Sequence, residues 1–264
     1  MENTYWLKQT KEQPLFPDLL WSRPESKQNR GKLLIIGGNA HGFAVPAEAY
    51  NEAINADVGT ARVLLPNVLQ KTVGSILEVA EYAPSTPSGS FNQKALAQMI
   101  DLGDWADGIL IAGELGRNAE TSAVLEKFIG KTGKPVVVTR DGIDIFNSSP
   151  DSVLNRDNTA LVLTLAQLQR LAQEVKFIDP ITFDMGLLRL VSWIHDFTQK
   201  FQANIVIKHL DNLFVGSGGQ VSSTKLQNDL KVWRVNTAAH CAVWWLQNTT
   251  KPFEALTVAV LEAT

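Results

Sequence analysis

Short apolar runs alternate with helical segments along most of the chain. Uninterrupted apolar runs are typical of strands buried on both faces, and they lie at residues 32–38, 61–65, 108–113, 135–139, 161–164 and 205–208. The segments that we expect to be helical lie at residues 46–55, 68–80, 92–102, 119–130, 167–174 and 184–201. Beyond them, the pattern predicts a hairpin at residues 213–222 and a pair of helices at residues 237–261. This alternation predicts the α/β class, with a mostly parallel central sheet in a three-layer α/β/α arrangement.

The first thirty residues do not share this pattern. Residues 1–30 are polar and rich in proline, which predicts an extended arm with one helical turn at residues 18–21. Three aromatic side chains would allow the arm to dock on the body, namely Trp6, Phe16 and Trp21. We therefore predict an N-terminal arm, residues 1–30, followed by a single α/β domain, residues 31–264.

Composition and charge narrow the classes of partner. The chain has 264 residues, of which 45% are hydrophobic, so it can bury a large core without disulfides. The 24 basic and 27 acidic side chains give a net charge of −3, which argues against a broad surface for nucleic acid or anionic membranes. The longest apolar run, residues 238–246, is too short to span a bilayer. We expect small-molecule ligands, with neither nucleic acid nor membrane as a partner.

Cysteine and histidine usage gives no sign of a metal centre. Cys241 is the single cysteine, so an intrachain disulfide and a cysteine zinc cluster are excluded. The four histidines lie apart in the sequence without the spacing of metal ligands. The first residues show no apolar leader. We predict no protein-held metal and a cytoplasmic location.

Ligands of open parallel sheets bind beyond the carboxyl ends of the strands. The segments expected there are residues 37–46, 113–117, 139–144, 164–167 and 208–212, and the approach to the helix at Asn236. These segments are the candidate site.

The motifs in these segments, taken in order, resemble the ribokinase-like superfamily. The resemblance is strongest to its ADP/ATP-dependent NAD(P)H-hydrate dehydratases and covers about residues 20–262. Gly37, Gly38 and Pro46 match a Gly-Gly-Ser loop that ends in Gly-Ala-Pro, and residues 115–117 match a Gly-Pro-Gly-Leu-Gly-Arg loop. Asp141 and Lys208 match single positions, the second aspartate of a Leu-Asp-Ala-Asp-Ala-Leu segment and the lysine of a Val-Leu-Lys-Gly strand.

The resemblance implies an activity and a set of site residues. Enzymes of this family repair hydrated NADH and NADPH: ATP or ADP, with Mg²⁺, donates a phosphoryl group to the hydrate's hydroxyl, and phosphate then leaves. The resemblance implies that the substrate is bound by Gly37, Gly38, Pro46, Gly116 and Asp141. It places the nucleotide at Lys208 and Asn236, and it implies a homo-oligomer.

The family's signature, Gly-Thr/Ser-Gly-Asp at the start of a helix, falls on residues 233–236, which read Trp-Arg-Val-Asn. Anion binding at a helix start uses backbone N–H groups, which glycines leave open to close approach. Asn236 occupies the position of the aspartate and has no ionisable carboxylate. Since general-base catalysis typically contributes about 10²–10⁴ in rate, its loss predicts weakened or lost catalysis.

Three matched residues each have a structural and a functional interpretation. Asn236 is favoured as an N-cap over any catalytic role, because asparagine is a common capping residue. Lys208 is either a phosphate contact or a surface lysine at a strand end. Asp141 either orients a substrate or metal or, as we favour, forms an Asp-Gly turn.

Two functions remain open. The first is a divergent nucleotide-dependent NAD(P)H-hydrate dehydratase or a related small-molecule kinase-like enzyme. The second is a pseudoenzyme that keeps the fold for binding, assembly or regulation. Glu114 replaces a loop glycine and brings negative charge to the expected substrate site, and Arg234 is a candidate for compensating positive charge. A new Asp or Lys facing the pocket would favour the enzyme, whereas a pocket filled by Trp233 and Arg234 would favour the pseudoenzyme.

Overall fold

A computed structural model describes residues 4–74, 76–177, 179–226 and 233–264. Within them, one ten-stranded sheet has the order β1-β10-β9-β8-β7-β6-β5-β2-β3-β4. The strands are β1 (Trp6–Gln9), β2 (Lys32–Gly37), β3 (Thr60–Pro66), β4 (Ala80–Ala83), β5 (Gly108–Gly113), β6 (Val136–Thr139), β7 (Thr159–Leu163), β8 (Asn204–His209), β9 (Asn212–Ser217) and β10 (Gln220–Lys225). Neighbouring strands are parallel except in the β8–β9 and β9–β10 pairs, so the sheet is mostly parallel, as predicted.

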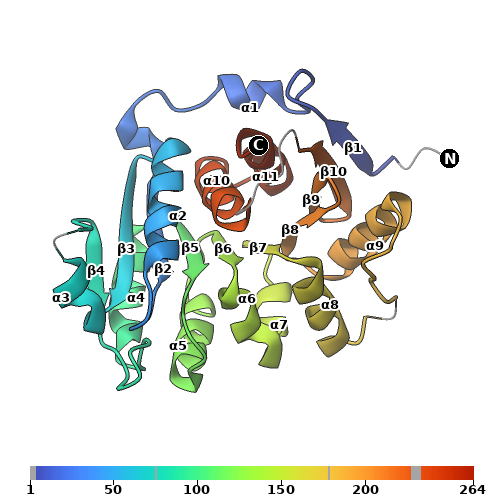
Figure 1. The fold of residues 1–264 in the computed structure, drawn as a ribbon. Coiled ribbons are helices and arrows are strands. Elements are labelled where there is room, and N and C mark those ends of the chain that lie inside the picture. The colour runs from blue at the N-terminus through green and yellow to red at the C-terminus, as the bar shows by residue number, and fades with distance from the viewer. Residues whose placement is uncertain (1–3, 75, 178, 227–232) are drawn as a thin grey trace.

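Helices lie on both faces of this sheet (Figure 1). One face carries α2 (Ala44–Asn55), α10 (Trp233–Gln247) and α11 (Pro252–Glu262). The other carries α4 (Ala95–Trp105), α5 (Ala119–Ile129), α6 (Asp141–Ile145), α7 (Asp151–Leu154), α8 (Leu165–Glu174) and α9 (Leu187–Lys200). Two short α-helices, α1 (Pro17–Trp21) and α3 (Gln70–Val73), and three 3-10 helices, Lys27–Arg30, Asn67–Leu69 and Phe146–Ser148, are also described.

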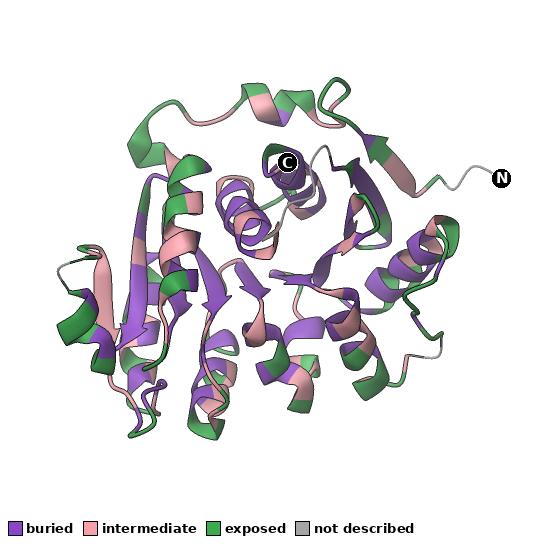
Figure 2. Ribbon diagram, in the orientation of Figure 1, coloured by how far each residue is buried: buried purple, intermediate pink, exposed green. Residues whose placement is uncertain are grey.

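The apolar runs form strands because both faces of the sheet are covered. In β2, Leu33 and Ile35 pack in the core on the α2 and α10 side, and Leu34 and Ile36 pack in the core on the opposite side. Figure 2 shows the central strands coloured almost wholly as buried. A strand with apolar neighbours on both sides has no position for a polar residue, which explains the unbroken runs.

One predicted helix is wrong. The segment 68–80 contains only a 3-10 turn, Asn67–Leu69, and the single-turn helix α3. Its last residue begins β4, which pairs in parallel with β3 and extends the sheet. Strand pairing therefore overrides the helical pattern here. The short helices α6 and α7 were also not predicted, because neither is long enough to show a helical period.

The N-terminal arm contacts the body through a strand as well as through side chains. β1 pairs in parallel with β10 at the edge of the sheet, and the Trp6 indole donates to Ser223 Oγ at 3.0 Å. The ring of Phe16 meets Phe253 edge-on at a centroid distance of 6.0 Å. Trp21 is 87% exposed, so the prediction that it docks on the body is wrong. Among the described helices, none is long and apolar enough to cross a membrane.

Candidate functional site

Two adjoining cavities open at the carboxyl ends of β5 and β6. The larger, about 710 Å³, lies between the start of α5, α6 and α8, and its lining includes Gly116, Asp141, Asp144 and Arg170. The smaller, about 260 Å³, is lined by Glu114, Arg140, Asp141, Asp144, Gln167 and Arg234. Asp141 and Asp144 border both, so the two cavities form one candidate site.

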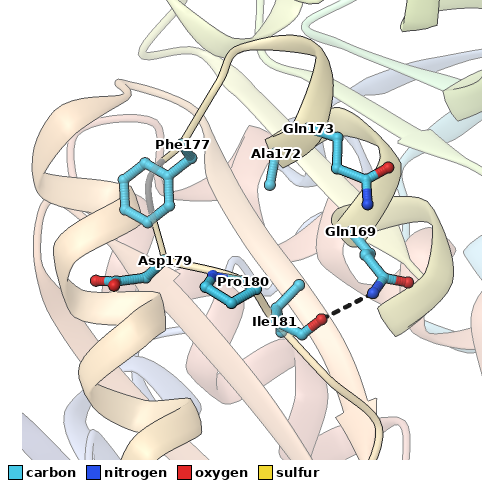
Figure 3. A pocket seen from close by; sticks show the side chains of 7 residues that line it. All are labelled: Gln169, Ala172, Gln173, Phe177, Asp179, Pro180 and Ile181. Carbon is cyan, nitrogen blue, oxygen red and sulfur yellow. Dashed lines mark hydrogen bonds between the residues drawn. The ribbon is translucent and has the colours of Figure 1, made fainter.

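A third cavity lies between α8 and the segment that follows it (Figure 3). It has a volume of about 110 Å³ and is lined by Gln169, Ala172, Gln173, Phe177, Asp179, Pro180 and Ile181. The Gln169 side chain donates to the carbonyl oxygen of Ile181 at 2.9 Å, which closes one side of it. Ligand pockets usually measure about 300–1,000 Å³, so this cavity is too small to compete with the site at β5 and β6.

Asp141 holds the loop that follows β5. Its two carboxylate oxygens accept hydrogen bonds from the backbone N–H groups of Glu114, at 2.7 Å, and Leu115, at 2.9 Å. Asp141 is also the first residue of α6, so the favoured prediction of an Asp-Gly turn is wrong. Both oxygens of this carboxylate already bind the protein's own backbone.

Glu114 supplies a carboxylate to the first turn of α2. Its Oε2 accepts from the Val45 N–H at 3.0 Å. Helix starts attract negative charge because their N–H groups lack intrahelical partners. Glu114 also adopts φ +57°, a left-handed conformation that favours glycine. The loop therefore keeps a glycine-like backbone while its side chain places an internal anion on α2.

The matched glycines permit a close approach of β2, β5 and α2. A Cβ on Gly37 would lie 2.6 Å from the carbonyl oxygen of Gly113 and 3.3 Å from the Pro46 ring, and Gly38 has φ +85°. Gly116, with φ +73°, lines the larger cavity. Gly37, Gly38 and Pro46 are not among the residues that line either cavity. Close packing is a sufficient reason for these three residues.

Asn236 lies inside α10 rather than at its cap. The described part of this helix begins at Trp233, three residues earlier, so the favoured N-cap prediction is wrong. The Asn236 amide donates to Glu52 Oε2 on α2 at 2.7 Å. Its Oδ1 is buried and has no hydrogen-bond partner among the described residues. Asn236 therefore joins two helices and does not line either cavity.

His240 lies one turn further along α10 in the same seam. Its Nε2 is 3.9 Å from Glu52 Oε2. Burial, together with the positive charge of Arg23, lowers the pKa of His240 to about 4. The ring is therefore neutral at neutral pH, and the contact with Glu52 is not an ion pair there.

Two arginines bring positive charge to the smaller cavity. Arg140 precedes α6, and Arg234 lies in the first described turn of α10. Burial and the nearby charge of Arg140 lower the pKa of Arg234, while Asp144 and Asp141 oppose this change. Within the described ranges, neither guanidinium forms a hydrogen bond or a salt bridge with a carboxylate. Trp233 instead packs against the apolar core beside α10.

Lys208 is half-buried on β8, opposite Leu213 of the hairpin. It does not line either of the two cavities. Of the residues that the resemblance assigns to substrate or nucleotide, the structure thus brings together Gly116 and Asp141, beside Glu114 and Arg234. A phosphate contact by Lys208 stays a prediction.

Two curated proteins resemble this chain at low identity. A bifunctional NAD(P)H-hydrate repair enzyme of Salinibacter ruber is 23% identical over 200 residues, which cover 74% of this chain and 35% of that protein. The corresponding enzyme of Dictyoglomus turgidum is 21% identical over 199 residues, covering 73% of this chain and 37% of that protein. The chain thus spans little more than a third of the length of the curated relatives it matches. No protein-family model matches it.

Solved structures of other proteins superimpose on nearly the whole of this chain. A ribokinase-like superfamily protein of Enterococcus faecalis superimposes with a TM-score of 0.73 at 16% identity, covering 98% of this chain and 87% of that one. The chain has a ribokinase-like fold. The ADP/ATP-dependent NAD(P)H-hydrate dehydratase of Bacillus subtilis, co-crystallised with ATP and Mg²⁺, superimposes with a TM-score of 0.62 at 14% identity, covering 94% and 86% of the two chains.

This ribokinase-like site differs from the one that the sequence resemblance implies. In the parts of the chain that the structure describes, no three His, Cys, Asp or Glu side chains are grouped to hold a metal ion. The α2 start already holds the Glu114 carboxylate, and Asn236 offers an amide that is bonded to Glu52. Residues 233–236 carry neither the glycines nor the aspartate of the signature, and residues 227–232 before them lie outside the described ranges.

The predicted segments 139–144 and 164–167 contain the lining residues Arg140, Asp144 and Gln167, but sequence reasoning singled out none of the three. The capping box of α8, in which Thr164 and Gln167 bond each other's backbone, was visible as a Thr-x-x-Gln pattern. Gln167 also reaches the carbonyl oxygen of Arg140 at 2.7 Å, a contact that spans 27 residues and leaves no local signal.

Proposed function

We propose that this protein is a divergent member of the NAD(P)H-hydrate dehydratase family that binds its ligand but has lost the phosphoryl-transfer step. In this proposal a three-layer ribokinase-like domain, residues 31–264, follows an N-terminal arm, residues 1–30. The relatives and the shared fold support the family assignment. The observation that carries the loss of chemistry is the environment of Asn236.

The Asn236 side chain cannot replace an aspartate base. A carboxamide does not accept a proton at neutral pH, and this one donates its N–H to Glu52 at 2.7 Å. Removing a general base typically costs about 10²–10⁴ in rate, and position 236 itself carries no carboxylate. The protein is therefore proposed as a pseudoenzyme with a binding or regulatory role.

The ligands proposed are those named for the relatives. The Salinibacter ruber protein is a repair enzyme for hydrated NAD(P)H, and the Bacillus subtilis enzyme was crystallised with ATP and Mg²⁺. We therefore propose ATP or ADP, with Mg²⁺ accompanying the nucleotide, and hydrated NAD(P)H as ligands. The same proposal includes Lys208 as a nucleotide contact, a cytoplasmic location and assembly into a homo-oligomer.

Asp144 supports a second candidate function. This carboxylate is exposed, borders both cavities and lies 3.3 Å from the Arg170 guanidinium. It is a carboxylate facing the pocket, which is the feature expected of an active enzyme with a remodelled site. In that case Asp144 would be the base of a remodelled phosphoryl-transfer site, and Asp144→Asn would abolish the activity.

A turnover assay tests the proposed function. Purified protein is incubated with hydrated NADH, Mg²⁺ and either ATP or ADP, and the recovery of NADH absorbance is followed. The Bacillus subtilis dehydratase serves as the positive control. We expect no recovery above the rate without protein, for the natural chain and for Asp144→Asn alike. Nucleotide-dependent recovery by the natural chain would contradict the proposal, and its loss in Asp144→Asn would favour the remodelled enzyme.

A further inference from the structure

We infer that Arg140 and Arg234 together form a binding site for a phosphate group in the 260 Å³ cavity. The inference rests on the proposed function in one respect, since it assigns a place to the phosphates of the proposed ligands. It does not require catalysis. The relatives' signature position has glycines and an aspartate, whereas this site would use two side-chain cations.

Within the described ranges, the carboxylates that line the cavity have hydrogen-bond or ion-pair partners, and the two guanidinium groups do not. Glu114 bonds the Val45 N–H, Asp141 bonds two backbone N–H groups, and Asp144 lies 3.3 Å from Arg170. By contrast, among the described residues the guanidinium groups of Arg140 and Arg234 have no carboxylate or carbonyl partner. Among the described residues that line this cavity, the charged groups without a partner are therefore the two cations.

The two guanidinium groups also repel each other. They line the same cavity, and the charge of Arg140 is among the causes that lower the pKa of Arg234. Two like charges that line one cavity repel each other, and Asp144 and Asp141 offset part of this effect at Arg234. An anion between them removes this repulsion and provides each guanidinium with the acceptors that it lacks.

The backbone at Arg140 is fixed in an unusual conformation. Its φ is +55° and its ψ is −134°, which is rare for a residue with a side chain. Gln167 holds its carbonyl oxygen at 2.7 Å, and the Arg140 side chain lies close to Gly113, where an added Cβ would come within 2.9 Å of Arg140 Cβ. Strained residues persist where neighbours fix them, and they concentrate at binding sites.

The chemistry and size of the site fit phosphate. A guanidinium is planar and donates two parallel hydrogen bonds to phosphate oxygens, so two of them can hold one phosphate or a diphosphate. The cavity adjoins the 710 Å³ cavity through Asp141 and Asp144, so the rest of a phosphorylated ligand has room beside it. The group bound could belong to a nucleoside diphosphate or to free inorganic diphosphate.

Calorimetry with two probes tests the site. Inorganic diphosphate and ADP are titrated into the natural chain, Arg140→Gln, Arg234→Gln, Arg234→Lys and Arg189→Gln. Arg189 is an exposed arginine on α9, so its variant controls for the loss of one positive charge. Thermal unfolding of each variant verifies that it is folded. We expect Arg140→Gln and Arg234→Gln each to weaken binding by about tenfold or more, because a hydrogen-bonded charge is lost.

The other outcomes have defined meanings. Arg234→Lys should bind with intermediate affinity, since it keeps the charge and loses the planar fork. ADP binding far tighter than diphosphate binding identifies a nucleotide as the source of the phosphate, and similar affinities identify free diphosphate. The inference is overturned if neither probe binds the natural chain at millimolar concentration. It is also overturned if binding is unchanged in both Gln variants, a result that leaves the proposed function intact. Turnover of hydrated NADH would instead overturn the proposed function alone.

Discussion

The helices α2 and α10 pack side by side. The first turn of α2 and the first described turn of α10 are associated with opposite charges. In α2, the Val45 N–H receives the Glu114 carboxylate from the loop after β5. In α10, the first described turn carries Arg234, whose guanidinium faces the smaller cavity without a carboxylate partner among the described residues. The α2 start is already satisfied by an internal anion, whereas the first described turn of α10 presents a cation.

This difference shows how a fold can keep its framework while its site changes. Backbone N–H groups bind an anion only where no side chain of the protein has reached them first. At α2 a side chain has done so. At α10 the polar groups are used to join the helices, because Glu52 of α2 accepts from Asn236. Binding would then depend on Arg140 and Arg234, as inferred above.

The largest expected effect concerns the loop that delivers Glu114 to α2. Asp141→Ala removes the acceptor of two backbone N–H groups, at 2.7 and 2.9 Å. Hydrogen bonds to charged groups typically contribute 1.5–3 kcal/mol each, so we expect the free energy of unfolding to fall by about 4 kcal/mol. Urea denaturation measures this.

Asp141→Asn is the matched control, because its carboxamide keeps one acceptor oxygen. It should lose about half as much stability as Asp141→Ala. A loss below about 1 kcal/mol in Asp141→Ala would show that the loop does not depend on this carboxylate.

The seam between α2 and α10 should make stability depend on pH. The pKa of His240 is about 4 in the folded protein, below its ordinary value of 6.5. The unfolded chain therefore takes up a proton first as the pH falls, and stability is lost between pH 6.5 and pH 4. The loss should reach about 3 kcal/mol by pH 4. Urea denaturation at pH 7 and pH 4 measures it.

His240→Gln removes this titration and should unfold with a smaller difference between the two pH values. His41→Gln, at an exposed histidine, should keep the full difference. If His240→Gln keeps it as well, the seam is not the source of the pH dependence.

The smallest expected effect separates the two roles of Glu114. Glu114→Ala loses the acceptor at α2 and keeps the left-handed backbone, so we expect it to lose about 1 kcal/mol. Glu114→Gly also loses the acceptor, but relief of the backbone at φ +57° offsets this by about 1 kcal/mol. The glycine variant should therefore be about as stable as the natural chain in urea denaturation.

Glu114→Gly also opens the start of α2 to an external anion. We expect phosphate to raise the Tm of Glu114→Gly more than that of the natural chain, with chloride at equal ionic strength as the control. Equal effects on both proteins would mean that Glu114 does not occupy an anion site.

The central strands, β2, β3, β5, β6, β7 and β8, could be predicted from the sequence because they are buried on both faces. β5 was predicted at residues 108–113, where the structure has it, since its apolar run ends at glycines. The helix predicted at residues 68–80 failed because periodicity does not report that β4 pairs with β3. Local pattern is sufficient where burial decides the structure, and it fails where pairing with a distant strand decides it.

The sequence predicted the site less completely than it predicted the strands. The resemblance placed Asp141 in the site. The carboxylate of Asp141 accepts hydrogen bonds from two backbone N–H groups, but these belong to residues 26 and 27 positions away. Arg140 lies in the predicted segment 139–144 but was not singled out, because its left-handed φ and its contact with Gln167 leave no local signal. The N-cap prediction for Asn236 failed because α10 begins at least three residues earlier.

A crystal structure of the protein with ADP and Mg²⁺ tests the central claim most directly. That claim is that side-chain cations, and not the start of α2, bind the phosphate. The account predicts phosphate density between Arg140 and Arg234, with the Glu114 carboxylate still bonded to the Val45 N–H. Phosphate at the start of α2, with Glu114 displaced, would contradict it.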